Sequence, residues 1–434
     1  RNPNLGLRID VTAAGGKIYF QDIRIEGLEA CAASADMNLT SLQDNGGGSY
    51  GFSATDAALA SFDTDLVCSW GDPNGAAILL AVDSVSFRNP LPGWTHRRAI
   101  RFDNLDRAEA LRDFPVPLLL DSTRVDYALC DGGDLRFLDE QLNPLAFEIE
   151  TWDESGLSVV WVRVPAIAAS SADSLIWMYY GNLGAEDGQD PAGVWDPAFV
   201  AVYHLAEDSG TTAIESSALN YEGTYVSGAN PGHDGMFSDG AVQLDGTDDR
   251  VSLGYVDVPP AAADDGLTLE FVGWLDSNVT DPDSRLISKS DGNQDANHWW
   301  MLSTDDEDNG NYALRFRLKL DGTTRVRSSN ERAITAEQWF YAVGTYDGSR
   351  MRMFVDGQEL SFDSPELTGT VTQDAGKLAT IGANFNGYKP FRGLAGEVRI
   401  SRRARSPAWI SAQQQAMLDE VADPFAIFGL EEAL

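Results

Sequence analysis

The chain has 434 residues and carries 67 acidic against 31 basic side chains, so its formal net charge is −36 at pH 7. A field of this sign repels phosphate backbones and anionic lipid head groups, which argues against nucleic-acid and membrane-surface partners. Self-repulsion of this size is tolerated mainly where salt screens it or divalent cations bind, so we expect a saline or marine exterior. The alternative is a solvated acidic surface without a particular partner.

The chain is long enough for about three domains. Its sequence features predict an extracellular location. The longest apolar run, residues 76–82, is far shorter than the ~18 to 20 residues that cross a membrane, and it predicts a buried strand. The chain begins at Arg1 without a methionine or a signal peptide, so we expect a processed N-terminus with anchoring sequences missing. We expect a prokaryotic extracellular or cell-surface protein.

The first ninety residues read as a β-sandwich that resembles no family we can name. Apolar alternation predicts strands over residues 5–12, 17–25, 49–55 and 76–87. The glycine-rich loop 45–48 is followed by neither a lysine nor a helix, so it is not a phosphate-binding loop. This domain, residues 1–90, suits a stalk or an assembly unit.

Three cysteines are unevenly placed along the chain. Cys31 and Cys68 both lie in the first domain, and this spacing in an exported chain predicts one disulfide. Cys130 stands alone and is expected to be a small buried hydrophobe.

The next segment carries several motifs in a fixed order. They are Gly93-Trp94, GDLRFLDEQLNPLAFEIETWDE at residues 133–154, VWVRVPAI at 160–167 and MYYGN at 178–182. Together they resemble the DUF2341 domain, a small β-rich domain of uncharacterised function that commonly precedes a lectin-like sandwich in prokaryotic surface proteins. The resemblance implies a β-rich domain over residues 91–196.

The second half contains a strong hairpin signal, AEQWFYAVGTYDGSRMRMFVDGQ at residues 336–358. Apolar alternation runs through both arms, and Asp347-Gly348 joins them. The pattern resembles the concanavalin A-like jelly roll of the LamG family (laminin G-like, pentraxin-like). Further segments resemble that family in the correct order: residues 199–210, 241–254, 266–274 and 377–402. Gly396-Glu397 departs from the pattern, in which Asp-Glu is common.

This resemblance implies a jelly roll over residues 197–434. One helix is expected at its end, over residues 406–418, with serine as N-cap and proline at the first helical position. We expect this helix to pack against the sandwich, and residues 424–430 to return as an edge strand. The predicted fold class is therefore all-β: tandem β-sandwich domains ending in a concanavalin A-like jelly roll with one short C-terminal helix.

The sequence predicts no catalytic residues, and we expect no enzyme. Glu148 and Glu150 alternate like the paired acids of a family 16 glucanase, but the central aspartate of that signature is Glu150 here. The strand also lies outside the lectin-like half, which contains no E-x-D-x-E. The histidines are scattered without metal-ligand spacing: His96, His204, His233 and His298.

The LamG resemblance implies a calcium ion at the rim of the sandwich. Asp245, Asp248 and Asp249 would meet Asn384, and also Asn386, to hold Ca²⁺ through hard oxygen ligands. The alternative is that these residues only form turns. The acidic loop 305–308 is a second candidate, or is simply solvated.

Sugar recognition needs flat apolar faces beside hydrogen-bonding groups. Six residues on or near loops are candidates for carbohydrate binding: Trp299, Trp300, Tyr312, Arg325, Asn386 and Tyr388. The alternative is a core role, and one of the two adjacent tryptophans must point inward on a strand.

Three functions fit these observations. The first is a non-catalytic surface protein with an adhesive or carbohydrate-binding role, whose partner is a glycan or extracellular polymer. The second is a structural subunit of an extracellular filament or pilus-like assembly, whose partners are neighbouring subunits. The third is an accessory binding region of a polysaccharide-degrading enzyme.

Overall fold

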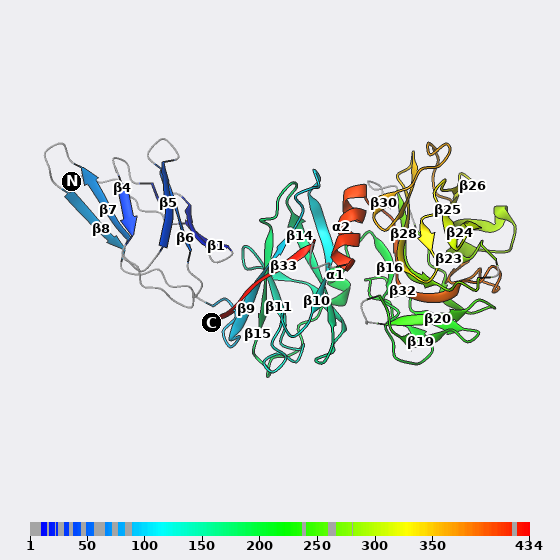
Figure 1. The fold of residues 1–434 in the computed structure, drawn as a ribbon, viewed down its shortest axis with the longest axis horizontal. Helices are drawn as coiled ribbons and strands as arrows, with labels where there is room; N and C mark the ends of the chain where they lie inside the picture. The colour runs from blue at the N-terminus through cyan, green and yellow to red at the C-terminus, as the bar shows by residue number, and fades with distance from the viewer. Residues whose placement is uncertain are drawn as a thin grey trace.

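The computed structural model describes residues 89–236, 240–258, 266–279, 281–418 and 423–434, and before residue 89 only the backbone of strands β1 to β8. The described chain is built almost wholly from antiparallel strands (Figure 1). This confirms the predicted all-β class. None of the helices in the described ranges is long and apolar enough to span a membrane.

The first domain contains two sheets. One joins β1 (Asp10–Ala14), β2 (Lys17–Gln21), β6 (Ser49–Thr55) and β3 (Ile23–Arg24), and β5 (Asn38–Asp44) also pairs with β6. The other joins β4 (Ala30–Ala33), β7 (Leu66–Gly71) and β8 (Ala77–Val82). Cys31 and Cys68 are register partners across β4 and β7. The disulfide itself stays a prediction, and loop 45–48 lies outside the described residues.

The middle unit is a sandwich of two sheets. The smaller sheet has the order β10 (Leu111–Leu120), β14 (Ser158–Ile167), β13 (Phe147–Thr151). The larger has the order β12 (Pro144–Leu145), β11 (Arg136–Asp139), β15 (Leu175–Tyr180), β9 (His96–Phe102), β33 (Ala426–Ala433). The short helix α1 (Pro191–Val194) ends the unit, with Asp190 capping it. Cys130 is buried and free, as expected.

Strand β33 brings the end of the chain back to the middle unit. Ala426 pairs with Phe102 and Ala433 with His96, and Figure 1 shows the red strand beside β9. The expected edge strand therefore exists, but it extends the middle sheet. Arg97 also forms an ion pair with Glu432 at 2.7 Å. Strand β33 lies within the range 197–434 that was expected to form the jelly roll, but it is part of a sheet of the middle unit.

Two large sheets form the jelly roll. The eight-stranded sheet runs β19-β20-β32-β22-β28-β29-β30, with β16 also paired to β32. Its strands span β16 (Phe199–Tyr203), β19 (Asn230–His233), β20 (Ala241–Asp245), β22 (Leu267–Leu275), β28 (Trp339–Tyr346), β29 (Met351–Val355), β30 (Gln358–Glu359) and β32 (Arg392–Ser401).

The nine-stranded sheet runs β17-β18-β21-β31-β23-β24-β25-β26, with β27 also paired to β25. Its strands span β17 (Thr212–Ala213), β18 (Gly223–Val226), β21 (Arg250–Gly254), β23 (Arg285–Ser290), β24 (His298–Asp308), β25 (Asn311–Leu320), β26 (Thr323–Ser328), β27 (Ile334–Thr335) and β31 (Leu378–Ile381). A short 3₁₀ helix, η1 (Asp295–Asn297), precedes β24.

The predicted hairpin is β28 and β29, with Tyr346 paired to Met351. Phe340 and Ala342 of β28 belong to the jelly-roll core. Tyr341 and Val343 on the other face are equally buried, but they belong to a second core that includes Trp161 of the middle unit. The eight-stranded sheet is therefore covered on both faces, once by its partner sheet and once by the middle unit.

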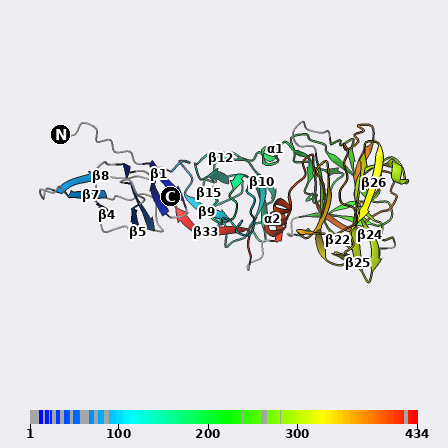
Figure 2. The same ribbon diagram turned by 90° about the horizontal axis from the view of Figure 1, so that it is seen from above.

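Helix α2 (Pro407–Leu418) completes this second core. Trp409 and Ile410 of α2 pack with Phe114 of β10, and the helix lies between the two units in both views (Figures 1 and 2). Ser406 Oγ accepts a hydrogen bond from the Trp409 amide, which is the expected N-cap. The helix thus packs against the sandwich as expected, and also against the middle unit.

Candidate functional site

The structure separates the predicted sugar-binding residues into buried and exposed groups. Trp300 is fully buried and Tyr312 nearly so, both within the jelly-roll core. Trp299 is only 8% exposed, and Lys319 Nζ lies 4.0 Å from the centre of its ring. These three aromatic residues do not present a free face, because Trp300 and Tyr312 pack inside the sandwich and Lys319 covers the ring of Trp299. Arg325, Asn386 and Tyr388 are exposed.

Asn386 and Tyr388 lie together on residues 382–390, which we call the Tyr388 loop. The Tyr388 side chain is 41% exposed. Asn386 Nδ2 donates to Asn293 Oδ1 at 3.2 Å, which joins two exposed amides. The loop is held by the Asn384 amide, which donates to the Tyr388 carbonyl at 2.9 Å. The loop therefore presents one aromatic face next to polar groups.

The predicted calcium ligands lie on two neighbouring loops, since a Cβ added at Gly387 would lie 2.9 Å from Asp248 Cβ. Asn384 is buried, and its Oδ1 accepts from Arg285 Nε at 3.1 Å and from Ser288 Oγ at 2.9 Å. Asp249 is also buried and accepts from the Asp245 amide, as a turn-forming aspartate does. Within the described ranges, the only group of three or more His, Cys, Asp or Glu side chains close enough to share a metal ion lies elsewhere.

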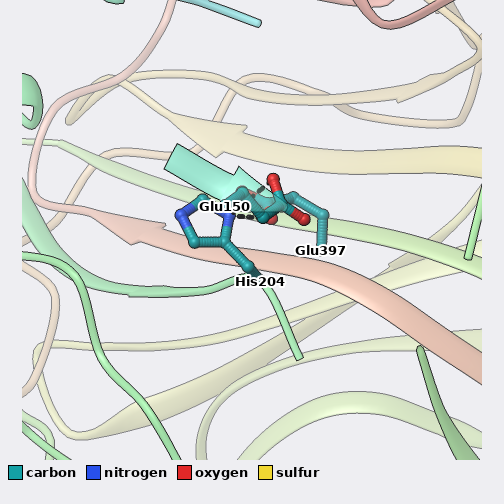
Figure 3. A group of neighbouring side chains, drawn as sticks. All are labelled: Glu150, His204 and Glu397. Carbon is teal, nitrogen blue, oxygen red and sulfur yellow. Dashed lines mark hydrogen bonds and ion pairs between the residues drawn. The ribbon is translucent and has the colours of Figure 1, made fainter. Parts of the chain in front are cut away.

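That group lies where the middle unit meets the jelly roll. Glu148 and Glu150 come from β13 of the middle unit, His204 follows β16, and Glu397 comes from β32 of the jelly roll. We call these four residues the His204 cluster. Figure 3 shows Glu150 and Glu397 directed at the same ring nitrogen of His204. The cluster exists only when both units are in place.

Distances within the His204 cluster are those of direct contacts. His204 Nδ1 lies 2.8 Å from Glu397 Oε2 and 3.3 Å from Glu150 Oε2. The other ring nitrogen, Nε2, lies 3.4 Å from Glu148 Oε2. Between 90% and 98% of each of the four side chains is withdrawn from solvent. Three carboxylates thus surround one imidazole in a buried place.

Neighbouring side chains fix the carboxylates. Glu148 accepts from Trp195 Nε1 at 3.0 Å and from Ser216 Oγ at 2.5 Å. Glu150 accepts from Trp161 Nε1 at 2.5 Å. The rings of Trp161 and Trp195 also lie against the imidazole of His204, each with centroids 5.6 Å from it. The tryptophans therefore both orient the acids and keep water from the ring.

A buried arginine adjoins the His204 cluster. Arg399 of β32 is fully buried, pairs with Glu270 at 2.8 Å and lies 3.7 Å from Glu397 Oε1. Tyr341 donates to the same Glu270 oxygen at 2.6 Å. Removing one member of such a pair would leave a buried charge uncompensated, at a cost of about 3 to 5 kcal/mol.

The carboxylates change the protonation of His204. Burial lowers the pKa of its imidazole, but Glu397, Glu150 and Glu148 outweigh burial and hold that pKa well above 6.5. Burial raises the pKa of Glu148, and the neighbouring His204 outweighs this, so the pKa of Glu148 lies below its usual range. The site thus favours a positive charge at the position of the imidazole.

The sequence pairs Glu148 with Glu150 on one strand, but His204 was expected to be a scattered histidine without metal-ligand spacing and the cluster was not predicted. The usable signal was the alternation of Glu148 and Glu150 on one strand. Nothing in the linear order indicates that His204 and Glu397 complete the set, because β16 and β32 become neighbours only by pairing in the folded sheet.

The fold and the sites define a β-sandwich protein with a lectin-like jelly roll. Residues 245–411 match the model of the concanavalin A-like lectin/glucanases superfamily. Residues 131–218 match the model of the domain of unknown function DUF2341. These matches confirm both predicted domain types in the predicted order. The second match includes Glu148, Glu150 and His204, and so reaches beyond the expected limit at residue 196 into β16.

Three solved structures are similar to parts of this chain, and two of them hold a bound sugar. Domain 4 of the extracellular arabinanase AbnA from Geobacillus stearothermophilus, in complex with arabinotriose, is 16% identical over 50% of this chain and 98% of that chain, with a TM-score of 0.36. The sialidase CBM40 from Ruminococcus gnavus, bound to α2,3 sialyllactose, is 16% identical over 35% and 83%, with a TM-score of 0.29. A SAP-like pentraxin from Limulus polyphemus is 13% identical over 39% and 82%, with a TM-score of 0.28. These low similarities carry no functional argument. No curated protein sequence matches the chain significantly.

Proposed function

We propose that this chain is an extracellular, non-catalytic carbohydrate-binding protein that holds a glycan on the Tyr388 loop. One observation carries the proposal: the exposed ring of Tyr388 lies on the same loop as Asn386, whose amide is bonded to the exposed amide of Asn293. The loop belongs to the segment that matches the concanavalin A-like lectin/glucanases superfamily.

The chemistry of the Tyr388 loop suits a sugar. Pyranose rings have an apolar C–H face and a rim of hydroxyl groups, so they are held by an aromatic ring together with amide donors and acceptors. Lys389 Nζ lies 5.7 Å from the centre of the Tyr388 ring and forms an ion pair with Asp281, which balances its positive charge. The surface is therefore suited to a neutral or hydroxyl-rich glycan.

The placement of the paired acids supports a non-catalytic role. A glycosidase needs two carboxyl groups on either side of an accessible glycosidic bond. Glu148 and Glu150 are instead buried against Trp195, Trp161 and His204.

The proposal is tested by measuring glycan binding of the full chain and of Tyr388→Ala on a glycan array, followed by affinity electrophoresis in gels containing the best glycan. We expect Tyr388→Ala to weaken binding at least about tenfold, since an aromatic contact of this kind contributes more than about 1 kcal/mol. The matched control is Tyr255→Ala, because Tyr255 is a 58% exposed tyrosine of the same jelly roll outside the Tyr388 loop.

Unchanged glycan binding in Tyr388→Ala, or an equal loss in Tyr255→Ala, would refute the Tyr388 loop as the binding surface. The same assay is run with calcium and with a chelator. The calcium ion expected at Asp245, Asp248, Asp249 and Asn384 stays a prediction, and a calcium requirement for binding is what it predicts.

A further inference from the structure

We propose that Glu150, His204 and Glu397 form a binding site for a divalent transition-metal ion at the junction of the middle unit and the jelly roll. Glu150 belongs to the middle unit, while His204 and Glu397 belong to the jelly roll. A metal ion here would hold the two units together. The inference is independent of the proposed glycan binding, because the Tyr388 loop contributes no residue to it.

The spacing of the donor atoms fits a coordination sphere. His204 Nδ1 lies 2.8 Å from Glu397 Oε2 and 3.3 Å from Glu150 Oε2, and the donor atoms of all three residues lie within 4.8 Å of one another. Ligands bound at about 2.0 to 2.2 Å in octahedral or tetrahedral geometry lie roughly 3.0 to 3.5 Å apart. Only small side-chain shifts are needed to admit an ion.

Glu148, the fourth residue of the His204 cluster, lies beside the ring nitrogen of His204 that would not bind the metal ion. Ligating histidines usually donate their second ring N–H to a carboxylate, which fixes the tautomer and raises ligand basicity. Glu148 Oε2 lies 3.4 Å from His204 Nε2 and is itself held by Trp195 and Ser216. This arrangement leaves Nδ1 as the metal-binding nitrogen.

Two buried atoms of the cluster have no hydrogen-bond partner. They are Glu397 Oε1 and His204 Nε2, of which Nε2 lies 3.4 Å from Glu148 Oε2 in an ion pair without a hydrogen bond, and the two side chains are only 5% and 8% exposed. Buried polar atoms are rarely left without a partner, so each one requires an explanation. A metal ion on Glu397 Oε2 supplies one for this carboxylate, because its other oxygen has only the Arg399 guanidinium, 3.7 Å away, to compensate it.

The charges of the cluster and its neighbours also call for a cation. Glu148, Glu150, Glu270 and Glu397 face one arginine, Arg399, and one imidazole. If His204 is protonated, these six groups still carry two excess negative charges in a buried place, where uncompensated charge is costly. A divalent ion with a neutral His204 lowers that excess to one.

The mixture of donors selects the class of metal. Calcium and magnesium prefer oxygen ligands alone, whereas one imidazole with two carboxylates suits zinc, manganese or ferrous iron. The rings of Trp161 and Trp195 pack against His204 and limit access of water. Such a closed site fits a structural ion. Its binding free energy would then add to the stability of the folded chain.

The experiment strips the full chain with a chelator, dialyses it, and titrates it with Zn²⁺ and with Mn²⁺ in excess Mg²⁺, which saturates the acidic surface. Metal content after gel filtration and the thermal midpoint are measured for the wild type, His204→Gln and Glu397→Gln. The matched control is His298→Gln, because His298 is also a buried histidine of the jelly roll but lies outside the cluster. We expect about one retained equivalent in the wild type and in the control, with at least tenfold weaker binding in the two ligand variants.

Three results would overturn the proposal. They are no metal retained by the wild type, equal retention in His204→Gln, and equal loss in His298→Gln. Circular dichroism checks the folding of each variant. If the ligand variants do not fold, X-ray absorption at the zinc edge of the loaded wild type decides, since scattering from one imidazole with two carboxylate oxygens is expected. A spectrum of oxygen ligands alone would show surface binding and refute the site.

Discussion

His204 and His298 are both buried histidines of the jelly roll, but their neighbours have opposite charges. Glu148, Glu150 and Glu397 surround His204. Arg317 Nη1 lies 3.3 Å from His298 Nδ1, while Asn384 Oδ1 lies 3.3 Å from His298 Nε2. Burial, then Arg317 and Arg285, lower the pKa of His298 to about 4. Residue type alone therefore does not determine what a buried histidine does.

The shift at His298 predicts a loss of stability in acid. Between pH 6.5 and 4, an unfolded chain binds a proton at this histidine that the folded chain does not bind. The stabilisation is fully present above pH 6.5 and is lost as the pH falls through this window, by about 3 kcal/mol at most. Urea unfolding of wild type and His298→Gln at several pH values measures the effect.

We expect the difference in unfolding free energy between the wild type and His298→Gln to shrink as the pH is lowered from 7 to 4.5. The many carboxylates titrate in both proteins, so they cancel in this difference. Parallel pH profiles for the two proteins would contradict the prediction.

The aromatic residues show how alternation limits a prediction at the residue scale. Trp299 and Trp300 are adjacent on β24, and alternation correctly indicated that one of them points inward. Trp299 is also nearly buried, because Lys319 of the neighbouring strand covers its ring. Tyr388 is exposed and lies on a loop instead of a strand. A hydrogen bond from the Asn384 amide to the Tyr388 carbonyl closes this loop.

At the scale of elements, strand β33 differs most from expectation. Residues 424–430 were expected to return as an edge strand, but no local pattern tells an edge strand which sheet it joins. The strand joins β9, where Glu432 pairs with Arg97 and Glu431 lies 3.7 Å from Arg98. Strand β9 would otherwise be an exposed edge with unpaired backbone groups.

Truncation of the full chain after Asp423 therefore tests the role of β33. We expect the truncated chain to lose several kcal/mol of stability, because a ladder of backbone hydrogen bonds and the pairing of Arg97 are lost. Urea unfolding followed by tryptophan fluorescence measures this loss.

A synthetic peptide of residues 424–434 should bind the truncated chain and restore its stability. The control is the same peptide with proline in place of Phe428, which cannot complete the ladder. Truncation without a change in stability would contradict the role of β33.

Strand β28 illustrates a second limit at the element scale. Alternation places Trp339, Tyr341, Val343 and Thr345 on one face of this strand, and Tyr341, Val343 and Thr345 are buried. The other face, with Phe340 and Ala342, is buried as well. When both faces of a strand are apolar, the sequence does not show which face contacts the core of its own domain.

At the scale of the whole molecule, the middle unit and the jelly roll share one core. Tyr341, Val343 and Phe354 of the jelly roll pack with Phe114 of the middle unit and Trp409 of α2. The chain also crosses this boundary twice, once before β16 and once between α2 and β33. Two units joined in this way have little freedom to move apart.

We therefore predict that the two units unfold together. Hydrogen exchange of the full chain at increasing urea should show amides of β10 and β14 losing protection at the same concentration as those of β22 and β28. Val343→Lys should lower that concentration for both sets, since it places a charge in the shared core.

The comparison variant for Val343→Lys is Leu253→Ala, whose side chain lies in the jelly-roll core. Leu253→Ala should lower the free energy of unfolding, while both sets of amides still lose protection at the same urea concentration. Two well-resolved urea midpoints in the wild type would contradict cooperative unfolding.

The sequence by itself determined the fold class, the order of the domains and the buried alternation of the main strands, because these depend on the period of apolar residues and on local turns. It also indicated the exposed pair Asn386 and Tyr388. Only the tertiary structure decided which sheet β33 joins, which tryptophan faces are covered, and that Glu148, Glu150, His204 and Glu397 meet. These outcomes depend on contacts between segments far apart in the chain, and linear spacing does not encode such contacts.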